Sequence, residues 1–72
     1  MNRTFVFRTI TGKCWGMSDN SWDAMVQAMG QERANKFTDR TKMSDWRTLN
    51  NWQKRATFYA RNGEEVADIT IQ

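Results

Sequence analysis

Apolar and polar residues alternate along the first 18 positions, as they do in β-strands. The stretch TFVFRT places Phe5 and Phe7 on one side of an extended chain and is rich in β-branched and aromatic residues. The Thr-Gly pair at 11–12 marks a turn, and residues 14–17 predict a short return strand. Gly16 weakens this second strand because glycine has no side chain to pack.

After residue 20 the apolar positions recur every three or four residues, which is typical of a helix. Asn20 or Ser21 can cap this helix, and Gly30 can end it. Residues 31–37 predict a shorter second helix anchored by Phe37. One face of the first helix holds four apolar residues that we expect in the core: Trp22, Met25, Val26 and Met29.

The middle of the chain predicts a loop followed by another helix. Residues 38–42 are polar and have no apolar period. Ser44 can cap a helix over 43–52, with Asp45 in its first turn. Its apolar stripe is wide, so we expect one end of it to be half buried. The residues of this stripe are Met43, Trp46, Leu49 and Trp52.

The last 18 residues alternate again, around an Asn-Gly pair at 62–63 that is a strong hairpin signal. A two-residue loop there places the face with Phe58 in the core, because that face is the more apolar one. It sets the cross-strand pairs Arg61–Glu64, Ala60–Glu65, Tyr59–Val66, Phe58–Ala67, Thr57–Asp68 and Ala56–Ile69.

An alternative interpretation makes residues 44–61 one helix, with Gly63 as its C-cap. We favour the hairpin because the consecutive residues 57–59 are β-branched or aromatic and lose rotamer freedom in helices. The sequence therefore predicts an α+β fold. A small antiparallel sheet, formed by one or two N-terminal strands and a C-terminal hairpin, is covered on one face by one or two helices.

The length of 72 residues predicts a single domain over 1–72. A core of this size supplies only about 3–5 kcal/mol of net stability. The chain has one cysteine and no histidine, so an internal disulfide is impossible and a structural zinc site is not expected. Association of two copies into a homodimer is one way for such a chain to gain stability.

The apolar pattern also bears on the compartment. No long apolar run follows the first charged residue, and no stretch approaches the roughly 20 apolar residues of a membrane span. We therefore expect a complete cytoplasmic chain without membrane association, in the host cytoplasm if a bacteriophage encodes it. The lone Cys14 fits a reducing compartment.

Positive charge is concentrated in the middle of the chain. The formal net charge is +3, yet residues 33–55 alone carry seven basic side chains against two carboxylates. Such asymmetry indicates a basic face. A mildly basic surface is also common in proteins that bind no nucleic acid.

The residue inventory argues against catalysis. No histidine is present for general acid or base work, and Cys14 has no histidine to activate it. The glycines match no phosphate-binding loop, and no set of residues has metal-ligand spacing. We expect a protein that is not an enzyme and holds no cofactor or metal.

The hairpin register points Tyr59 away from the core, among basic residues of its own strand. We also expect at least one of Trp15, Trp46 and Trp52 to be partly exposed, because tryptophan is hard to bury completely in a small domain. Exposed tryptophan beside arginine is typical of protein-binding hot spots. The candidate partner-binding residues are Arg8, Arg47, Trp52, Arg55, Tyr59 and Arg61.

Three functional hypotheses follow. The first is a small binding protein of the kind that bacteriophages and other mobile elements encode, which docks on a larger host protein and modulates or inhibits it. The second is a small basic protein that binds nucleic acid through arginine, tyrosine and tryptophan. The third is a homo-oligomeric assembly component. We favour the first, because no known nucleic-acid-binding signature is present.

Overall fold

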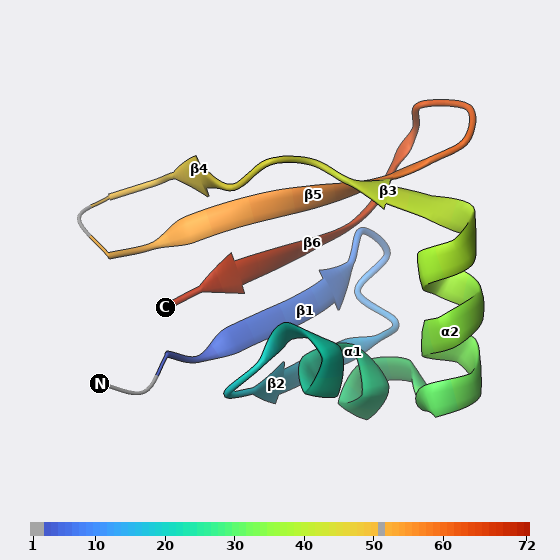
Figure 1. Cartoon of the computed structure of the whole chain (residues 1–72), viewed down its shortest axis with the longest axis horizontal. Helices are drawn as coiled ribbons and strands as arrows, with labels where there is room; N and C mark the ends of the chain where they lie inside the picture. The colour runs from blue at the N-terminus through green and yellow to red at the C-terminus, as the bar shows by residue number, and fades with distance from the viewer. Residues whose placement is uncertain (1–2, 51) are drawn as a thin grey trace.

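Residues 3–50 and 52–72, which the computed structural model describes, form six strands and two helices. In chain order these are β1 (Phe5–Thr9), β2 (Trp15–Ser18), α1 (Ser21–Met29), α2 (Gln31–Arg40), β3 (Thr41–Met43), β4 (Arg47–Thr48), β5 (Lys54–Ala60) and β6 (Glu65–Ile71) (Figure 1). The strands build one antiparallel sheet in the order β2-β1-β6-β5-β3, and β4 also pairs with β5. The predicted α+β fold, with a sheet made from both ends of the chain, is confirmed.

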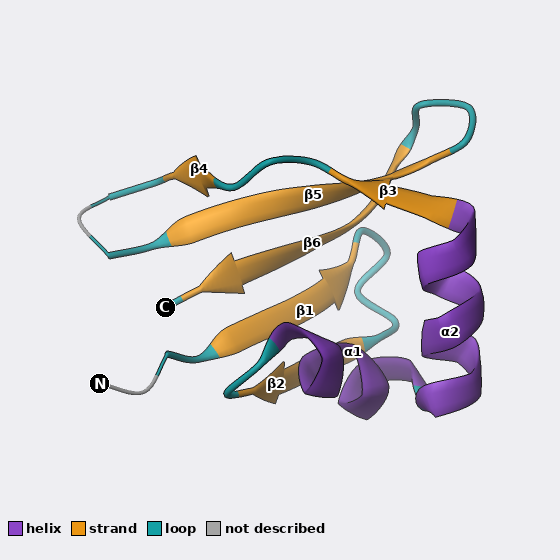
Figure 2. Ribbon diagram, viewed as in Figure 1, coloured by secondary structure: helices purple, strands orange, loops and turns teal. Residues whose placement is uncertain are grey.

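The helices pack on one side of this sheet, which we call the inner face (Figure 2). Alternate residues of the central strands point toward it, as the pleat of a strand requires. The rings of Phe7 and Phe58 lie 5.7 Å apart, and both contact Phe37 of α2, at 5.5 and 5.3 Å. Phe37 is therefore the anchor of the second helix, as predicted. The buried core residues are Phe7, Ala24, Met25, Ala34, Ala56, Phe58, Ala67 and Ile69.

Gly16 of β2 marks the place where α1 comes closest to the sheet. A Cβ atom at this position would overlap the carbonyl oxygen of Ala24 and lie 2.7 Å from the backbone nitrogen of Ala28. A glycine inside a strand often serves such a close backbone approach. Gly16 therefore weakens β2 as an isolated strand but allows α1 to pack closely against it.

The local signals for α1 are confirmed. The Asn20 side chain accepts a hydrogen bond from the backbone N–H of Asp23, as an N-cap does. Gly30 ends the helix with a φ of 85°, in the region that favours glycine. On the predicted apolar face Met25 is buried, and Val26 and Met29 pack against the core. The predicted place of Trp22 in the core is wrong, because its side chain is 38% exposed.

The polar segment 38–42 is not a loop, which corrects the sequence prediction. Helix α2 continues to Arg40, and β3 starts at Thr41 without an intervening connection. Local hydrogen bonds carry the helix through these polar residues. Thr38 Oγ1 donates to the Asn35 carbonyl at 2.9 Å, and Thr41 Oγ1 donates to the Phe37 carbonyl at 2.7 Å.

The predicted helix over 43–52 is wrong, and so is the alternative helix over 44–61. The described part of this region is extended and pairs with β5. Ser44 binds the strand instead of capping a helix. Its N–H donates to the Thr57 carbonyl at 2.8 Å, and its Oγ accepts from the Thr57 N–H at 2.9 Å. Trp46 then packs edge-on against Phe5, with ring centroids 6.2 Å apart.

The C-terminal hairpin is confirmed in its body but not at its turn. The predicted pairs Ala56–Ile69, Thr57–Asp68 and Phe58–Ala67 are all present. The Ala60 N–H donates to the Glu64 carbonyl, which leaves a three-residue turn rather than the predicted two-residue one. The predicted pairs of Arg61 with Glu64 and of Ala60 with Glu65 are therefore wrong.

The turn differs because a two-residue turn over Asn62 and Gly63 of type I′ needs a positive φ at both residues, and one of type II′ needs it at Asn62. Gly63 has a φ of 85°, whereas among the described residues no non-glycine residue has a positive φ, Asn62 included. A bulge between Phe58 and Tyr59 absorbs the extra residue. Tyr59 consequently pairs with Glu65, not with Val66 as predicted.

Candidate functional site

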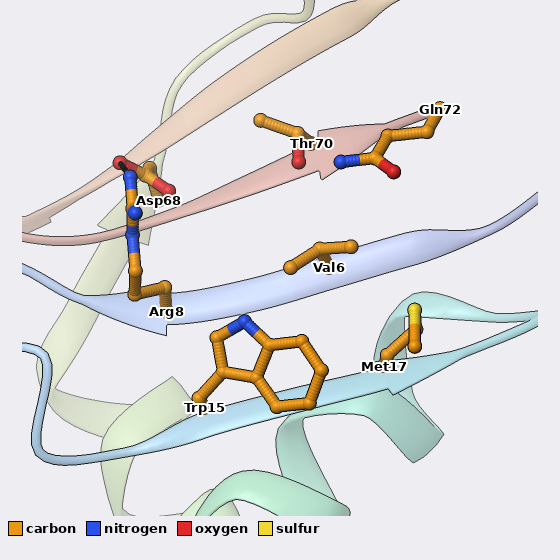
Figure 3. A pocket seen from close by; sticks show the side chains of 7 residues that line it. All are labelled: Val6, Arg8, Trp15, Met17, Asp68, Thr70 and Gln72. Carbon is orange, nitrogen blue, oxygen red and sulfur yellow. Dashed lines mark ion pairs between the residues drawn. The ribbon is translucent and has the colours of Figure 1, made fainter.

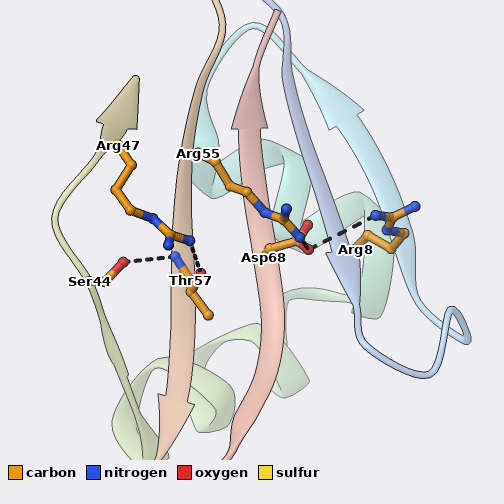
Figure 4. Close-up of polar contacts among 6 residues, drawn as sticks. All are labelled: Arg8, Ser44, Arg47, Arg55, Thr57 and Asp68. Carbon is orange, nitrogen blue, oxygen red and sulfur yellow. Dashed lines mark hydrogen bonds and ion pairs between the residues drawn. The ribbon is translucent and has the colours of Figure 1, made fainter. Parts of the chain in front are cut away.

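The side of the sheet opposite α1 and α2 carries the candidate site, and we call it the outer face (Figure 4). The alternation that turns Phe5 and Phe7 inward turns Val6 and Arg8 outward. The register of each strand pair then adds the outward residues of the neighbouring strands. The outer face holds Val6, Arg8, Trp15, Met17, Lys42, Arg47, Arg55, Thr57, Tyr59, Glu65, Asp68 and Thr70.

Asp68 lies at the centre of this face and is only 5% exposed. Arg55 Nη2 donates to Asp68 Oδ2 at 2.5 Å from one side. Arg8 Nη2 lies 4.0 Å from the same oxygen on the other side (Figure 4). A carboxylate this buried is stable only when it is paired, and Arg55 provides the close partner.

Arg47 extends the polar row across β5. Its Nη2 donates to Thr57 Oγ1 at 3.1 Å, and Arg47 stands directly opposite Arg55 in the β4–β5 pair. Two like charges in such positions repel each other. The Arg55–Asp68 ion pair offsets that repulsion, so the middle of the outer face is an ordered polar network rather than a freely solvated surface.

A hollow of about 350 Å³ lies beside this network, over β2, β1 and β6. Arg8 and Asp68 lie at one end of it, Met17 and Gln72 at the other, and Val6 between them (Figure 3). Trp15 is 54% exposed and Met17 43% exposed, which is high for large apolar side chains. The residues that line the hollow are Val6, Arg8, Trp15, Met17, Asp68, Thr70 and Gln72.

The structure brings four of the candidate residues to the outer face and leaves two away from it. Arg8 and Arg55 converge on Asp68, Arg47 joins them through Thr57, and Tyr59 lies further along β5. The remaining two lie beyond opposite ends of β5. Trp52, which is 74% exposed, comes just before the strand, and Arg61 lies in the turn after it.

Sequence reasoning did not assign Trp15, Met17 or Asp68 to the site. The expectation of a partly exposed tryptophan is confirmed by Trp15 and Trp52, while Trp46 packs on Phe5. The spacing of Trp15 and Met17, two apart in a strand, was the available signal, because it places both on one face. Their position beside Arg8 follows from the β1–β2 register, which pairs Arg8 with Trp15.

Among the described residues, no group of three or more histidine, cysteine or acidic side chains is arranged to hold a metal ion. Cys14 is a half-buried free thiol just before β2. No described helix combines the length and apolar character needed to cross a membrane.

No family model matches this chain, and no curated protein or solved structure matches it significantly.

Proposed function

We propose that this chain is a small non-catalytic binding protein that docks its outer face on a larger protein. It acts in the cytoplasm, as an accessory protein of a bacteriophage or another mobile element, and modulates or inhibits a host protein. The observation that carries the proposal is the exposure of Trp15 and Met17 beside Arg8 at the hollow. Tryptophan, methionine and arginine are enriched at protein interfaces, and tryptophan and arginine dominate their hot spots.

The ordered backbone that carries Trp15 and Met17 favours binding. Trp15 and Met17 stand on a strand of the sheet rather than on a loop, and Gly16 between them is fixed against α1. Asp68 and Arg55 hold the neighbouring strands in register through an ion pair in which the carboxylate is buried. A surface that is already ordered loses little conformational entropy when a partner binds.

Nucleic-acid binding is the second candidate, and the basic side chains of the outer face favour it. Lys42, Arg47, Arg55 and Arg8 lie there together with Tyr59. Two observations make it the weaker candidate. Arg55 is engaged by Asp68, and the basic stretch 33–55 is divided, because its first basic residues lie on α2 rather than on the sheet.

The test uses two matched variants. Trp15→Ala combined with Met17→Ala removes the apolar part of the outer face, and Trp52→Ala removes a more exposed tryptophan that lies outside it. A protein captured from a bacterial lysate is identified, purified and titrated against all three chains. We expect the double variant to bind at least about tenfold more weakly, and Trp52→Ala to bind like the unchanged chain.

A titration with single-stranded and double-stranded DNA and RNA, followed by tryptophan fluorescence at two salt concentrations, separates the two candidates. Binding driven by phosphate contacts must weaken steeply as salt rises. Tight, salt-sensitive binding lost in Arg47→Gln would favour the nucleic-acid function. Equal capture of the protein partner by the double variant would contradict docking through the outer face.

A further inference from the structure

We infer that the hollow recognises a short acidic peptide segment, in which an apolar side chain packs between Trp15 and Met17 and a neighbouring carboxylate binds Arg8. This inference rests on the proposed docking function and names the chemistry of the partner. It follows from how the charges are distributed around the hollow, from its size, and from the hydrogen bond that occupies the Met17 N–H at the edge of β2.

Arg8 is the cation available to a ligand. Its side chain is 59% exposed and lies 4.0 Å from Asp68, whereas Arg55 is 38% exposed and bonded to the same carboxylate oxygen at 2.5 Å. Because Arg55 already satisfies that oxygen, most of the N–H donors of Arg8 remain for an incoming group. A guanidinium presents a planar fork that matches a carboxylate in two parallel hydrogen bonds.

The charge of the hollow favours an anionic ligand. Asp68 is the single acidic side chain in its lining, and it is buried and paired. Lys42, Arg47 and Arg55 add positive charge further along the outer face, against the exposed carboxylate of Glu65. A surface with this balance attracts acidic segments and speeds their association.

The size of the hollow limits the occupant. A volume of about 350 Å³ is at the lower end of ligand-binding sites, which hold roughly 300–1,000 Å³. It accommodates one or two side chains rather than a folded element. Val6, Trp15 and Met17 supply apolar contacts for the anchor, and Thr70 and Gln72 supply polar groups for the peptide backbone.

The edge of β2 favours recognition through side chains over addition of a strand. The Met17 N–H, which a new strand would need, donates instead to Gln27 Oε1 of α1 at 3.3 Å. Strand addition depends on a row of free backbone groups at the sheet edge. The acidic peptide therefore lies across the outer face and contacts Arg8, Trp15 and Met17 through side chains.

The experiment selects binders from a displayed library of random short peptides against the full chain. We expect the selected peptides to share an aliphatic or aromatic residue close to an aspartate or glutamate. Synthetic copies are then titrated by fluorescence anisotropy. Arg8→Gln should weaken binding about tenfold and Trp15→Ala at least as much, which corresponds to one lost charged hydrogen-bond pair or hot-spot contact.

Arg33→Gln is the matched control, because Arg33 is an exposed basic residue on α2, away from the outer face. It should bind the peptides like the unchanged chain. Arg8→Lys should bind with intermediate affinity, because lysine keeps the charge but not the two-point geometry. Circular dichroism confirms that each variant is folded.

Several outcomes would overturn the inference: no selected binders, binders without acidic residues, unchanged affinity of Arg8→Gln, or capture of an oligonucleotide or a second copy by the same residues. If the Trp15 and Met17 double variant still loses the protein partner in any of these cases, docking through the outer face stands and only the acidic peptide is wrong. If the double variant keeps that partner, both proposals fail.

Discussion

The two faces of the sheet are built by the same strands but are stabilised in different ways. On the inner face, Phe7, Phe58 and Ile69 are buried under the helices beside small alanines. On the outer face, Thr57 and Asp68 are almost as buried, but each accepts a hydrogen bond from an arginine side chain. The buried residues of the inner face are stabilised by hydrophobic packing. Those of the outer face are stabilised by hydrogen bonds to arginine side chains.

This difference separates stability from recognition within one small domain. The inner face removes apolar surface from water, which is the dominant favourable term in folding. The outer face leaves Trp15 and Met17 partly exposed, so their burial is still available to a partner. Truncating the exposed apolar residues of the outer face should therefore weaken binding more than stability, whereas changes on the inner face should chiefly lower stability.

Phe7→Ala should have the largest effect. Phe7 is fully buried and contacts both Phe37 and Phe58, so its truncation should cost about 3–5 kcal/mol. A domain with a core this small should then be largely unfolded at room temperature. Val6→Ala, one residue away but on the outer face, should cost below about 1 kcal/mol. Urea unfolding of both variants checks this contrast, and equal losses would contradict the division between the faces.

Gly16→Ala should be the next most disruptive change. The added Cβ meets the backbone of Ala24 and Ala28, so α1 has to move as a unit. We expect a loss of about 2–3 kcal/mol, the usual range for overpacking a close contact. Met17→Ala, the next residue but on the outer face, is the control and should change stability little. A melting temperature unaffected by Gly16→Ala would show that α1 is not seated on β2.

Asp68→Asn should destabilise the protein by about 1–3 kcal/mol, because it removes the negative charge that pairs with the Arg55 guanidinium. Arg8→Gln should cost no more than about 0.5–1 kcal/mol, since its ion pair is long and exposed. The double variant Asp68→Asn with Arg55→Gln should lose less than the two single losses combined. Strict additivity in thermal unfolding would mean that the two residues do not interact in solution.

Trp52→Ala should have the smallest effect on stability, within about 0.5 kcal/mol, because its side chain is 74% exposed. Trp46→Ala, six residues earlier, should cost at least about 1–2 kcal/mol through the lost contact with Phe5 and the core. Chemical unfolding of the two variants measures the difference. A larger loss for Trp52 would contradict its position outside both faces.

The elements that sequence reasoning predicted correctly are those with local signals. Asn20 caps α1 and Gly30 ends it, and both choices depend on neighbouring residues in the chain. The alternation around Phe58 set the register of the hairpin body, because a slip of one residue would turn every apolar side chain outward. The predicted helix over 43–52 was wrong because apolar residues spaced three apart also fit a helix. No neighbouring residue in the sequence indicates that Trp46 instead packs against the distant Phe5.

The site was predicted only in part, for a related reason. Arg55 was expected beside Tyr59 on its own strand, and Arg8 was a separate candidate on the first strand. The pairing of β1 with β6 brings Arg8 to the same face. Asp68 joins them because β6 lies between β1 and β5 and carries the carboxylate that both arginines approach. Arg61 was placed beside Tyr59 by the predicted two-residue turn, and Trp52 was chosen as an exposed aromatic residue. Strand β5 ends at Ala60 and starts at Lys54, so both residues lie beyond its ends.

The sequence by itself determined which residues share a face of β1 and of the body of the C-terminal hairpin, and where α1 starts and stops, because strand alternation and helix capping act over a few residues. Tertiary structure decided the strand order, the extended path between α2 and β5, and the hollow beside Arg8. Those features depend on contacts between residues distant in the chain, such as Phe5 with Trp46 and Arg55 with Asp68. Their free energy is gained only when the whole sheet forms, so no local pattern records it.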